Sequence, residues 1–341
     1  MSNSVPTAYR ITAEDRPRVD ISVIVPVYKE EENIQPFLRR TVPILEALGS
    51  YEVIFCLDPS PDRTEQIIVE EAASNPNIGL LVFSRRFGQP AATIAGLHHC
   101  VGDSCVVIDV DLQDPPELIS EMYAKSKEGF DVVYAVRSSR EGETFVKNVI
   151  SAFGYRLINR VTDVAIPRDT GDFRLLTRKV IDELSALKEG HGFLRGLVAF
   201  VGFPQTAIYY DRQARAAGKT KYNPLTGSFK IAFNGLFGFS TVPLSFLMWF
   251  GVIVAMLSLV AIVLTMVLKL VFQQDFPLGV PTITIAVLFM GGVEMFAIGV
   301  IGEYTGRIYD EVRDRPQYIV HHAVNLGAKR STQALSSERT Q

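Results

Sequence analysis

The sequence lacks several features that would define the class of the protein at once. Its 34 lysines and arginines nearly balance 37 aspartates and glutamates, so the net charge of −3 gives no reason to expect bulk binding to nucleic acid. Its three cysteines, Cys56, Cys100 and Cys105, show no paired-ligand spacing, which argues against a disulfide framework and fits a reducing cytosol. The polar residues 1–20 contain no apolar run, so we expect no secretory signal there.

Parts of the chain also lack charged residues. The mean hydropathy of +0.18 is positive, but an average over the whole chain does not show where the apolar runs lie. Charged residues are frequent up to about Phe229 and almost absent between Phe239 and Gly302. The apolar run from Leu244 to Leu268, about 25 residues at 1.5 Å each, is long enough to cross a ~30 Å hydrocarbon core. We therefore predict two transmembrane helices within residues 240–306, at about 244–270 and 278–302, instead of two buried core helices.

The charges that flank these runs predict their orientation. The connection between them has no lysine or arginine, whereas basic residues precede the first run and follow the second. The positive-inside rule then places the catalytic part, the polar tail 1–20 and the tail 307–341 in the cytoplasm, with two spans in an inner or plasma membrane. Glu294 interrupts the second run, and both a helix contact and a functional role stay open.

The first two thirds of the chain alternate short β-branched runs with helical patterns. The predicted strands are 21–27, 51–57, 78–83, 105–109 and 131–136, and the predicted helices are 31–48, 62–74, 90–100 and 115–127. This order predicts an α/β domain over residues 21–221 with a doubly wound, mostly parallel sheet. Sheets of this kind bind ligands at the carboxyl ends of their strands.

Two amphipathic segments, 144–161 and 222–239, follow the alternating part. Either segment can pack on the sheet, or it can lie in the membrane interface with its basic residues facing the headgroups. Because 222–239 leads directly into the first apolar run, we favour interfacial helices for both.

The strongest chemical motif is VVIDVDLQDPPE, residues 106–117. Asp109 and Asp111 follow a predicted buried strand, where alternate carboxylates can hold a divalent cation that also binds phosphate oxygens. Turn chemistry is the alternative, because aspartate is common where strands end. Asp114, followed by Pro115 and Pro116, is expected to cap the next helix.

As a whole, the sequence resembles a membrane-anchored family 2 glycosyltransferase with a GT-A fold, of the polyprenyl-phosphate glycosyltransferase group. That group includes bactoprenol glucosyltransferases and dolichol-phosphate mannose synthases. The resemblance extends over most of residues 21–320 and rests on ISVIVPVYKEEENI, IFCLDPSPDRT, SRRFGQPAATIAGL, IDVDLQDPPE, TGDFRLLTRKV, GFLRGL, RQARAAGKTKY and IGEYTGRIYDEV.

The resemblance implies roles for individual residues on the donor side. Residues matching those that bind the nucleotide-sugar are Pro26, Tyr28, Glu30, Asp58, Asp109, Arg137, Arg215 and Lys221. Asp58 is expected to hydrogen-bond the base, although Leu57 and Pro59 depart from the family's Asp-Asp-Gly-Ser pattern. A divalent metal, Mg²⁺ or Mn²⁺, is expected on Asp109, Asp111 and Gln113.

The resemblance places Asp172 and Arg174 of the TGDFRLL block near the reacting centre. Cations follow them in the sequence, and five are candidates to bind the acceptor phosphate: Arg195, Arg212, Arg215, Lys219 and Lys221. Such a basic run is equally typical of a solvated face, but beside a membrane it suits a lipid phosphate.

The predicted function is inverting transfer of a single hexose, favoured as glucose from UDP-glucose, to undecaprenyl phosphate at the cytosolic membrane face, as in cell-envelope glycosylation. GDP-mannose with a dolichyl phosphate, transfer of a modified arabinose, and a non-enzymatic nucleotide-sugar-binding scaffold are the alternatives. We also expect a homo-oligomer, a dimer or a tetramer. The strand-like run 316–322 either joins a neighbouring subunit's sheet or returns to its own domain.

Overall fold

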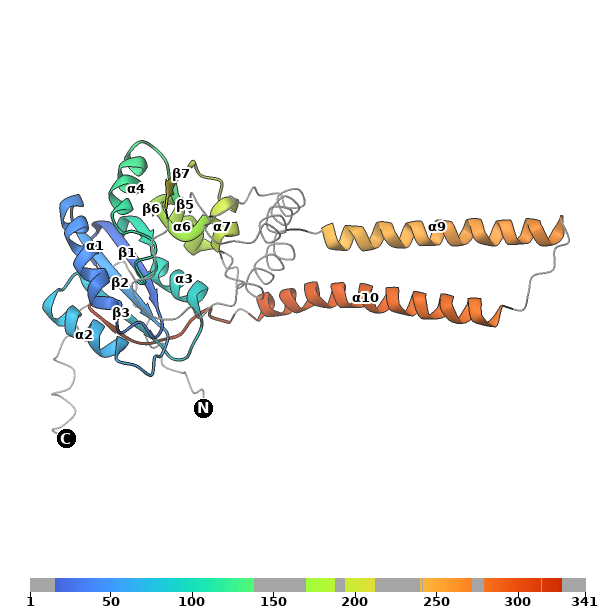
Figure 1. Ribbon diagram of the computed structural model, residues 1–341, viewed down its shortest axis with the longest axis horizontal. Coiled ribbons are helices and arrows are strands. Elements are labelled where there is room, and N and C mark those ends of the chain that lie inside the picture. The colour runs from blue at the N-terminus through green and yellow to red at the C-terminus, as the bar shows by residue number, and fades with distance from the viewer. Residues whose placement is uncertain are drawn as a thin grey trace, which may run out of the picture.

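The computed structural model describes residues 16–137, 170–187, 194–211, 240, 242–271, 279–313 and 315–326. The amphipathic segments 144–161 and 222–239 lie outside these residues. The described residues form an α/β body from which two long helices extend side by side (Figure 1).

The body is built on an eight-stranded sheet with the order β7-β5-β6-β4-β1-β2-β3-β8. The strands are β1 (Val19–Val27), β2 (Tyr51–Leu57), β3 (Ile78–Phe83), β4 (Gly102–Val107), β5 (Val132–Arg137), β6 (Thr170–Thr177), β7 (Gln205–Tyr210) and β8 (Val320–Val324). The first five confirm the predicted strands, with small shifts at their ends. Buried valine, isoleucine and leucine side chains fill β1 to β4 on both faces, as a sheet covered on both sides requires.

The sheet is mixed but mostly parallel, as predicted, because only β6 and β8 run against the other six described strands. β1 is parallel to β2 and β4, and β5 is parallel to β7, but β6 is antiparallel to both β4 and β5. β6 is the TGDFRLLT segment, in which the buried Phe173, Leu175 and Leu176 stand among the polar Asp172 and Arg174. Its hydrophobic pattern was too irregular to indicate a strand.

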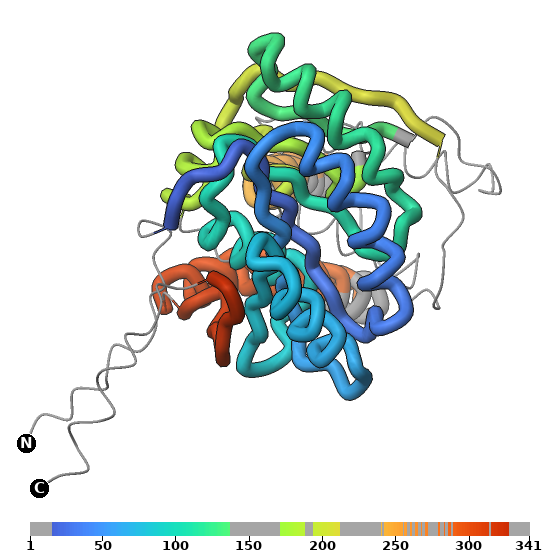
Figure 2. Tube along the Cα trace, turned by 90° about the vertical axis from the view of Figure 1, so that its left-hand side faces the viewer, coloured from blue at the N-terminus to red at the C-terminus, as the bar shows by residue number. Residues whose placement is uncertain are grey.

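Helices cover both faces of the sheet (Figures 1 and 2). One layer holds α1 (Ile34–Leu48), α2 (Thr64–Ser74) and α4 (Leu118–Lys127), and the other holds α3 (Gln89–His99), α6 (Arg178–Ala186) and α7 (Leu194–Phe200). In α1, the buried Ile34, Phe37, Leu38, Thr41 and Leu45 recur at three- and four-residue intervals, which turns one stripe of the helix to the sheet.

The predicted cap at Asp114 is wrong. α4 begins at Leu118, and the carboxylate of Asp114 instead accepts a short hydrogen bond from the Tyr210 hydroxyl at the end of β7. Both side chains are buried. Asp114 therefore connects the chain after β4 to the edge strand β7.

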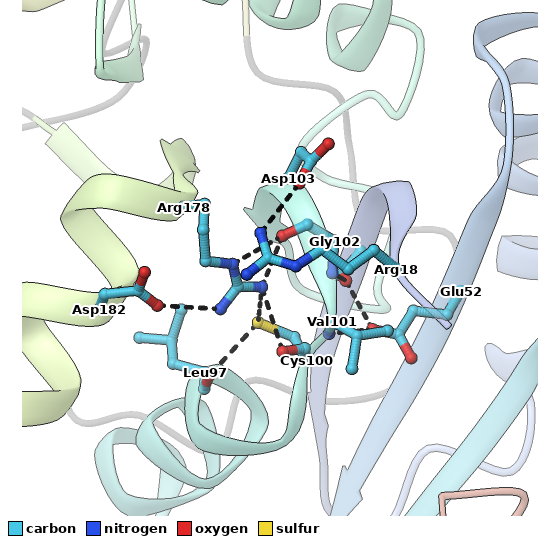
Figure 3. Close-up of polar contacts among 10 residues, drawn as sticks. Arg18, Glu52, Leu97, Cys100, Val101, Gly102, Asp103, Arg178 and Asp182 are labelled. Carbon is cyan, nitrogen blue, oxygen red and sulfur yellow. Dashed lines mark hydrogen bonds and ion pairs between the residues drawn. The ribbon is translucent and has the colours of Figure 1, made fainter. Parts of the chain in front are cut away.

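A polar network anchors the amino ends of the central strands, away from the ends at which ligands bind (Figure 3). The buried carboxylate of Glu52 accepts hydrogen bonds from the Ser22 hydroxyl at 2.6 Å and the Val101 N–H at 2.7 Å. Arg178 of α6 donates to the backbone carbonyls of Cys100 and Gly102. These contacts hold the connection between α3 and β4, and Figure 3 shows them converging from several elements.

The run after the second long helix returns to its own domain, so the alternative of strand exchange with a neighbour is not what the structure shows. β8 pairs antiparallel with β3, and just before it Tyr318 packs on Phe83 and on the histidines of α3. The Ser84 N–H donates to the Ile319 carbonyl at 2.9 Å. β8 therefore covers the edge of β3, and the residue just before β8 contacts the chain that follows β3.

The two long helices, α9 (Val242–Leu270) and α10 (Val280–Val312), coincide with the two apolar runs. α10 continues about ten residues beyond the predicted end, because Glu303 and Arg307 pair four residues apart on its surface at 2.9 Å. Counting only the residues that the structure describes, we find no helix both long enough and apolar enough to cross a membrane.

Candidate active site

The site lies where the winding of the sheet reverses. From β1 the chain moves outward through β2 and β3, and then returns to add β4 on the other side of β1. The crevice at the carboxyl ends of two such strands is the usual ligand site of an open α/β sheet. The loops after β1 and β4 carry Lys29 and Leu112 with φ of 57° and 59°, a left-handed conformation that side chains other than glycine adopt at a cost.

The predicted donor residues Pro26, near the end of β1, and Tyr28 and Glu30, in the loop after it, are all half-buried. This loop is held against the loop after β2 and the start of α2, because the Lys29 and Glu30 N–H groups donate to the hydroxyls of Ser60 and Thr64, both at 2.9 Å. The Glu30 carboxylate also accepts from the Asn33 amide at 2.7 Å. The donor loop therefore has a defined shape before any ligand binds.

Asp58 is buried and binds backbone instead of facing the crevice. Its two carboxylate oxygens accept the N–H groups of Phe87 and Gly88, each at 2.9 Å. The role predicted from the resemblance, a hydrogen bond to the base, stays a prediction. In the structure, Asp58 binds the connection between β3 and α3.

The paired aspartates after β4 form a compact turn. Asp111 is buried, and its carboxylate accepts the Gln113 N–H at 3.1 Å across the left-handed Leu112. Asp109 is half-buried and accepts from the Gln89 amide at 2.9 Å. Among the described residues, no group of three or more histidine, cysteine, aspartate or glutamate side chains is arranged to hold a metal.

That donor set fits a hard cation shared with a substrate. Two carboxylates and the amide oxygen of Gln113 supply only part of a six-coordinate shell of oxygen ligands, and Mg²⁺ is commonly held by one or two carboxylates together with substrate phosphates. Asp109, Asp111 and Gln113 therefore suit a cation that arrives with a diphosphate.

Asp172 of β6 lies among cations. Its carboxylate accepts the Arg195 Nε–H at 3.0 Å, and an Arg174 nitrogen lies 3.9 Å away. Arg195, which belongs to α7, was predicted to bind the acceptor phosphate. In the structure it lies next to Asp172, which the resemblance places near the reacting centre. The Gln89 amide nitrogen also lies 3.5 Å from Asp172.

Arg174 carries a positive charge that is almost fully buried, with 3% of the residue exposed. It donates to the Gly171 carbonyl at 2.9 Å, while its Nε has no hydrogen-bond partner among the described residues. Burial lowers the pKa of Arg174 to about 10, although Asp172 opposes this shift. The guanidinium stays charged at neutral pH.

The other predicted cations cannot be placed beside these residues. Arg212, Arg215, Lys219 and Lys221 lie outside the described residues, and of Arg137 only the backbone is described, at the end of β5. Two residues without a predicted role do reach the site: Gln89, and Arg86, whose guanidinium lies 4.1 Å over the ring of Tyr28. Both belong to SRRFGQPAATIAGL, so the resemblance pointed to the block but not to a task for either side chain.

Comparison with known proteins identifies the class of protein that this fold and site define. The sequence profile of glycosyl transferase family 2 matches residues 22–185, which include the described site residues up to Asp172 and Arg174. An uncharacterized glycosyltransferase of Bacillus subtilis is 44% identical over 92% of this chain and 96% of that protein. The chain belongs to glycosyl transferase family 2 and is an enzyme of that class.

More particular relatives carry a substrate in their names. A prophage bactoprenol glucosyl transferase homolog of Escherichia coli is 39% identical over 88% of this chain and 98% of that protein. The prophage-derived bactoprenol glucosyl transferase of Shigella flexneri is 39% identical over 88% of this chain and 97% of its own length. The membrane anchor and the oligomer expected from the sequence are not established by these matches.

Proposed function

We propose that this enzyme transfers a single glucose from a nucleotide-sugar, favoured as UDP-glucose, to a polyprenyl phosphate, favoured as undecaprenyl phosphate. The observation that carries the proposal is the site at the switch point, where Gln89 binds both Asp109 and Asp172, and Asp172 lies beside Arg174 and Arg195. Relatives named bactoprenol glucosyl transferase over most of the chain support the choice of sugar and acceptor.

The proposed reaction forms one bond and breaks one. An oxygen of the lipid phosphate attacks the anomeric carbon while the bond from that carbon to the diphosphate breaks. The electron pair leaves with the nucleoside diphosphate, and the configuration inverts. Because a phosphate is already an anionic nucleophile near neutral pH, the site needs groups that position it more than a strong base.

The protein's contribution is orientation and charge. Arg195 and Arg174 balance the negative charge of Asp172, so this carboxylate can accept hydrogen bonds from sugar hydroxyls without adding net repulsion toward two phosphate groups. We propose that Asp109, Asp111 and Gln113 hold Mg²⁺ or Mn²⁺. When bound, that cation would neutralise charge on the departing diphosphate.

We further propose that α9 and α10 form the membrane hairpin, with the catalytic body on its cytosolic side. The support comes from the sequence, which includes residues of both helices whose side chains the structure does not describe. The run from Leu244 to Leu268 has no charged residue and, at 1.5 Å per residue, is long enough to cross a ~30 Å hydrocarbon core. Large apolar side chains stay exposed along both helices, including Phe246, Trp249 and Leu257 of α9 and Phe289 and Ile298 of α10. Apolar surface on this scale needs a cover, and lipid chains supply one.

The test is to incubate membranes containing the full-length enzyme with a panel of labelled nucleotide-sugars and undecaprenyl phosphate. We expect a glucosyl-phosphate lipid from UDP-glucose. A mannosyl or arabinosyl lipid would replace the favoured donor by one of the alternatives, and binding of nucleotide-sugar without any lipid product would support the scaffold.

The acceptor cations predicted from the sequence are tested at Arg215. Charge-assisted contacts to a phosphate contribute roughly 1.5–3 kcal/mol, so Arg215→Ala should lower turnover about tenfold to a hundredfold with normal membrane insertion. Arg140→Ala is the matched control, because no role is assigned to Arg140. Equal losses in the two variants would reduce the effect to general charge and remove Arg215 from the acceptor site.

A further inference from the structure

Gln89 connects two carboxylates that come from different strands. It is the first residue of α3, and its side-chain nitrogen lies 2.9 Å from an oxygen of Asp109 and 3.5 Å from an oxygen of Asp172. Asp109 follows β4 on the donor side, and Asp172 lies in β6 next to Arg195. One neutral side chain thus reaches both halves of the proposed site.

The register of the sheet brings these two carboxylates to neighbouring positions. β4 and β6 are antiparallel with Val107 opposite Arg174, so continuing that register by two residues brings Asp109 opposite Asp172. Two neighbouring carboxylates repel each other, and the repulsion is stronger where water is partly excluded. A primary amide has two N–H donors and no charge, so it can hold both carboxylates without competing with a bound cation.

The position of Gln89 is set by its backbone, because the residue itself is largely exposed. Asp58 binds the two preceding N–H groups, Gly88 has a φ of 91° that favours glycine, and the Thr93 hydroxyl donates to the Gln89 carbonyl at 3.0 Å. The other end of the same connection is held where the Ser84 N–H meets the Ile319 carbonyl. These contacts direct the start of α3 toward the carboxylates.

We propose that Gln89 is a positioning residue that sets the spacing of Asp109 and Asp172, and through it the spacing of donor diphosphate and sugar. This inference rests on the proposed function for its effect on turnover. Its geometric part, the placement of a neutral amide between two carboxylates, does not depend on the identity of the sugar.

The experiment compares Gln89→Glu and Gln89→Leu in the full-length enzyme. Gln89→Glu puts a third carboxylate between two others, so repulsion replaces the hydrogen bonds that Gln89 makes to both. Turnover by Gln89→Glu should be about a hundredfold below wild type. Gln89→Leu should lose about tenfold in kcat, with the KM of the donor changed less than threefold.

A second readout, thermal stability, does not require transfer. Gln89→Glu should melt about 3 °C below wild type because of the added repulsion, and Gln89→Leu, which adds no charge, should melt within about 1 °C of wild type. Gln66 supplies the matched control, since it is an exposed glutamine whose amide also binds a carboxylate, that of Glu70 at 2.8 Å. Gln66→Glu and Gln66→Leu should leave turnover unchanged.

The outcomes separate the inference from the proposed function. A wild type that glycosylates no polyprenyl phosphate would overturn the proposed function, while the melting temperatures of Gln89→Glu would still decide the placement of Gln89. Normal turnover in both Gln89 variants of an active enzyme, or a Gln89→Glu variant that melts at the same temperature as Gln89→Leu, would overturn the inference.

Discussion

At the residue scale, the buried guanidinium of Arg174 serves the site and lowers the stability of the fold. Burying a charge in the sheet interior costs desolvation energy. The ion pair at 3.9 Å and the single hydrogen bond to a carbonyl offset only part of that cost. Its Nε without a partner among the described residues adds to that cost. Because the pKa of Arg174 is lowered to about 10, its protonation opposes folding at neutral pH, and stability gains from its deprotonation only above about pH 10.

Arg174→Met should therefore separate activity from stability. We expect a melting temperature equal to or above that of wild type and a loss of turnover of about a hundredfold or more. Arg178→Met is the control with the opposite pattern: Arg178 binds the Gly102 carbonyl away from the site, so its loss should lower the melting temperature and leave the donor KM unchanged. A strongly destabilised Arg174→Met would contradict this reading.

A substitution at Asp111 tests the proposed metal site. Asn keeps the shape and can still accept the Gln113 N–H, so Asp111→Asn should fold normally, with a melting temperature within about 2 °C of wild type. Its turnover should fall about a hundredfold or more, because the amide lacks the negative charge with which the Asp111 carboxylate would hold the divalent cation. Near-normal turnover of this variant in excess EDTA would show that the metal assignment is wrong.

At the scale of elements, the connection between β3 and α3 organises the site. Its Phe87 N–H donates to Asp58, which follows β2, and its Ser84 N–H donates to the Ile319 carbonyl in the chain after α10. Tyr318 adds ring contacts to Phe83, His98 and His99 at centroid distances of 5.8–5.9 Å. A segment more than 200 residues away in sequence thus supports the last turn of α3 and the end of β3, where that connection begins.

Tyr318→Ala should weaken both the fold and the site. Loss of the aromatic contacts should lower the free energy of unfolding by about 2 kcal/mol, and turnover should fall because Phe83 leads into the connection between β3 and α3. Tyr318→Phe keeps the ring and loses only the hydrogen bond to His98 at 3.0 Å, so it should cost about 1 kcal/mol. Urea unfolding of the two variants measures the difference, and equal losses would assign the effect to the hydroxyl.

At the scale of the whole molecule, the proposed arrangement is a catalytic body at the cytosolic end of a two-helix membrane hairpin. Cys56, Cys100 and Cys105 are all buried, so they leave a low background for thiol labelling. In intact cells, an impermeant maleimide should label Gln274→Cys in the connection between the spans and should not label Ser336→Cys in the C-terminal tail.

Permeabilised cells provide the control, because both introduced cysteines should then react. Labelling of Ser336→Cys in intact cells would place the tail outside and reverse the proposed orientation. Protection of both cysteines in intact cells would contradict a hairpin that crosses the membrane.

The sequence by itself determined the elements that depend on local patterns. Five strands, four helices of the body and the positions of the two long apolar helices followed from hydrophobic periodicity, which reflects burial along a short stretch of chain. The loops after β1 and β4 were predicted as the site, because parallel strands direct their carboxyl ends to one edge.

Only the tertiary structure decided which side chains meet. The antiparallel insertion of β6 brings Asp172 to Asp109, the start of α3 places Gln89 between them, and Asp58 binds backbone amides instead of projecting into the crevice. β8 closes the edge of its own sheet. Strand order and register depend on packing between residues far apart in sequence, and a local pattern carries no record of that packing.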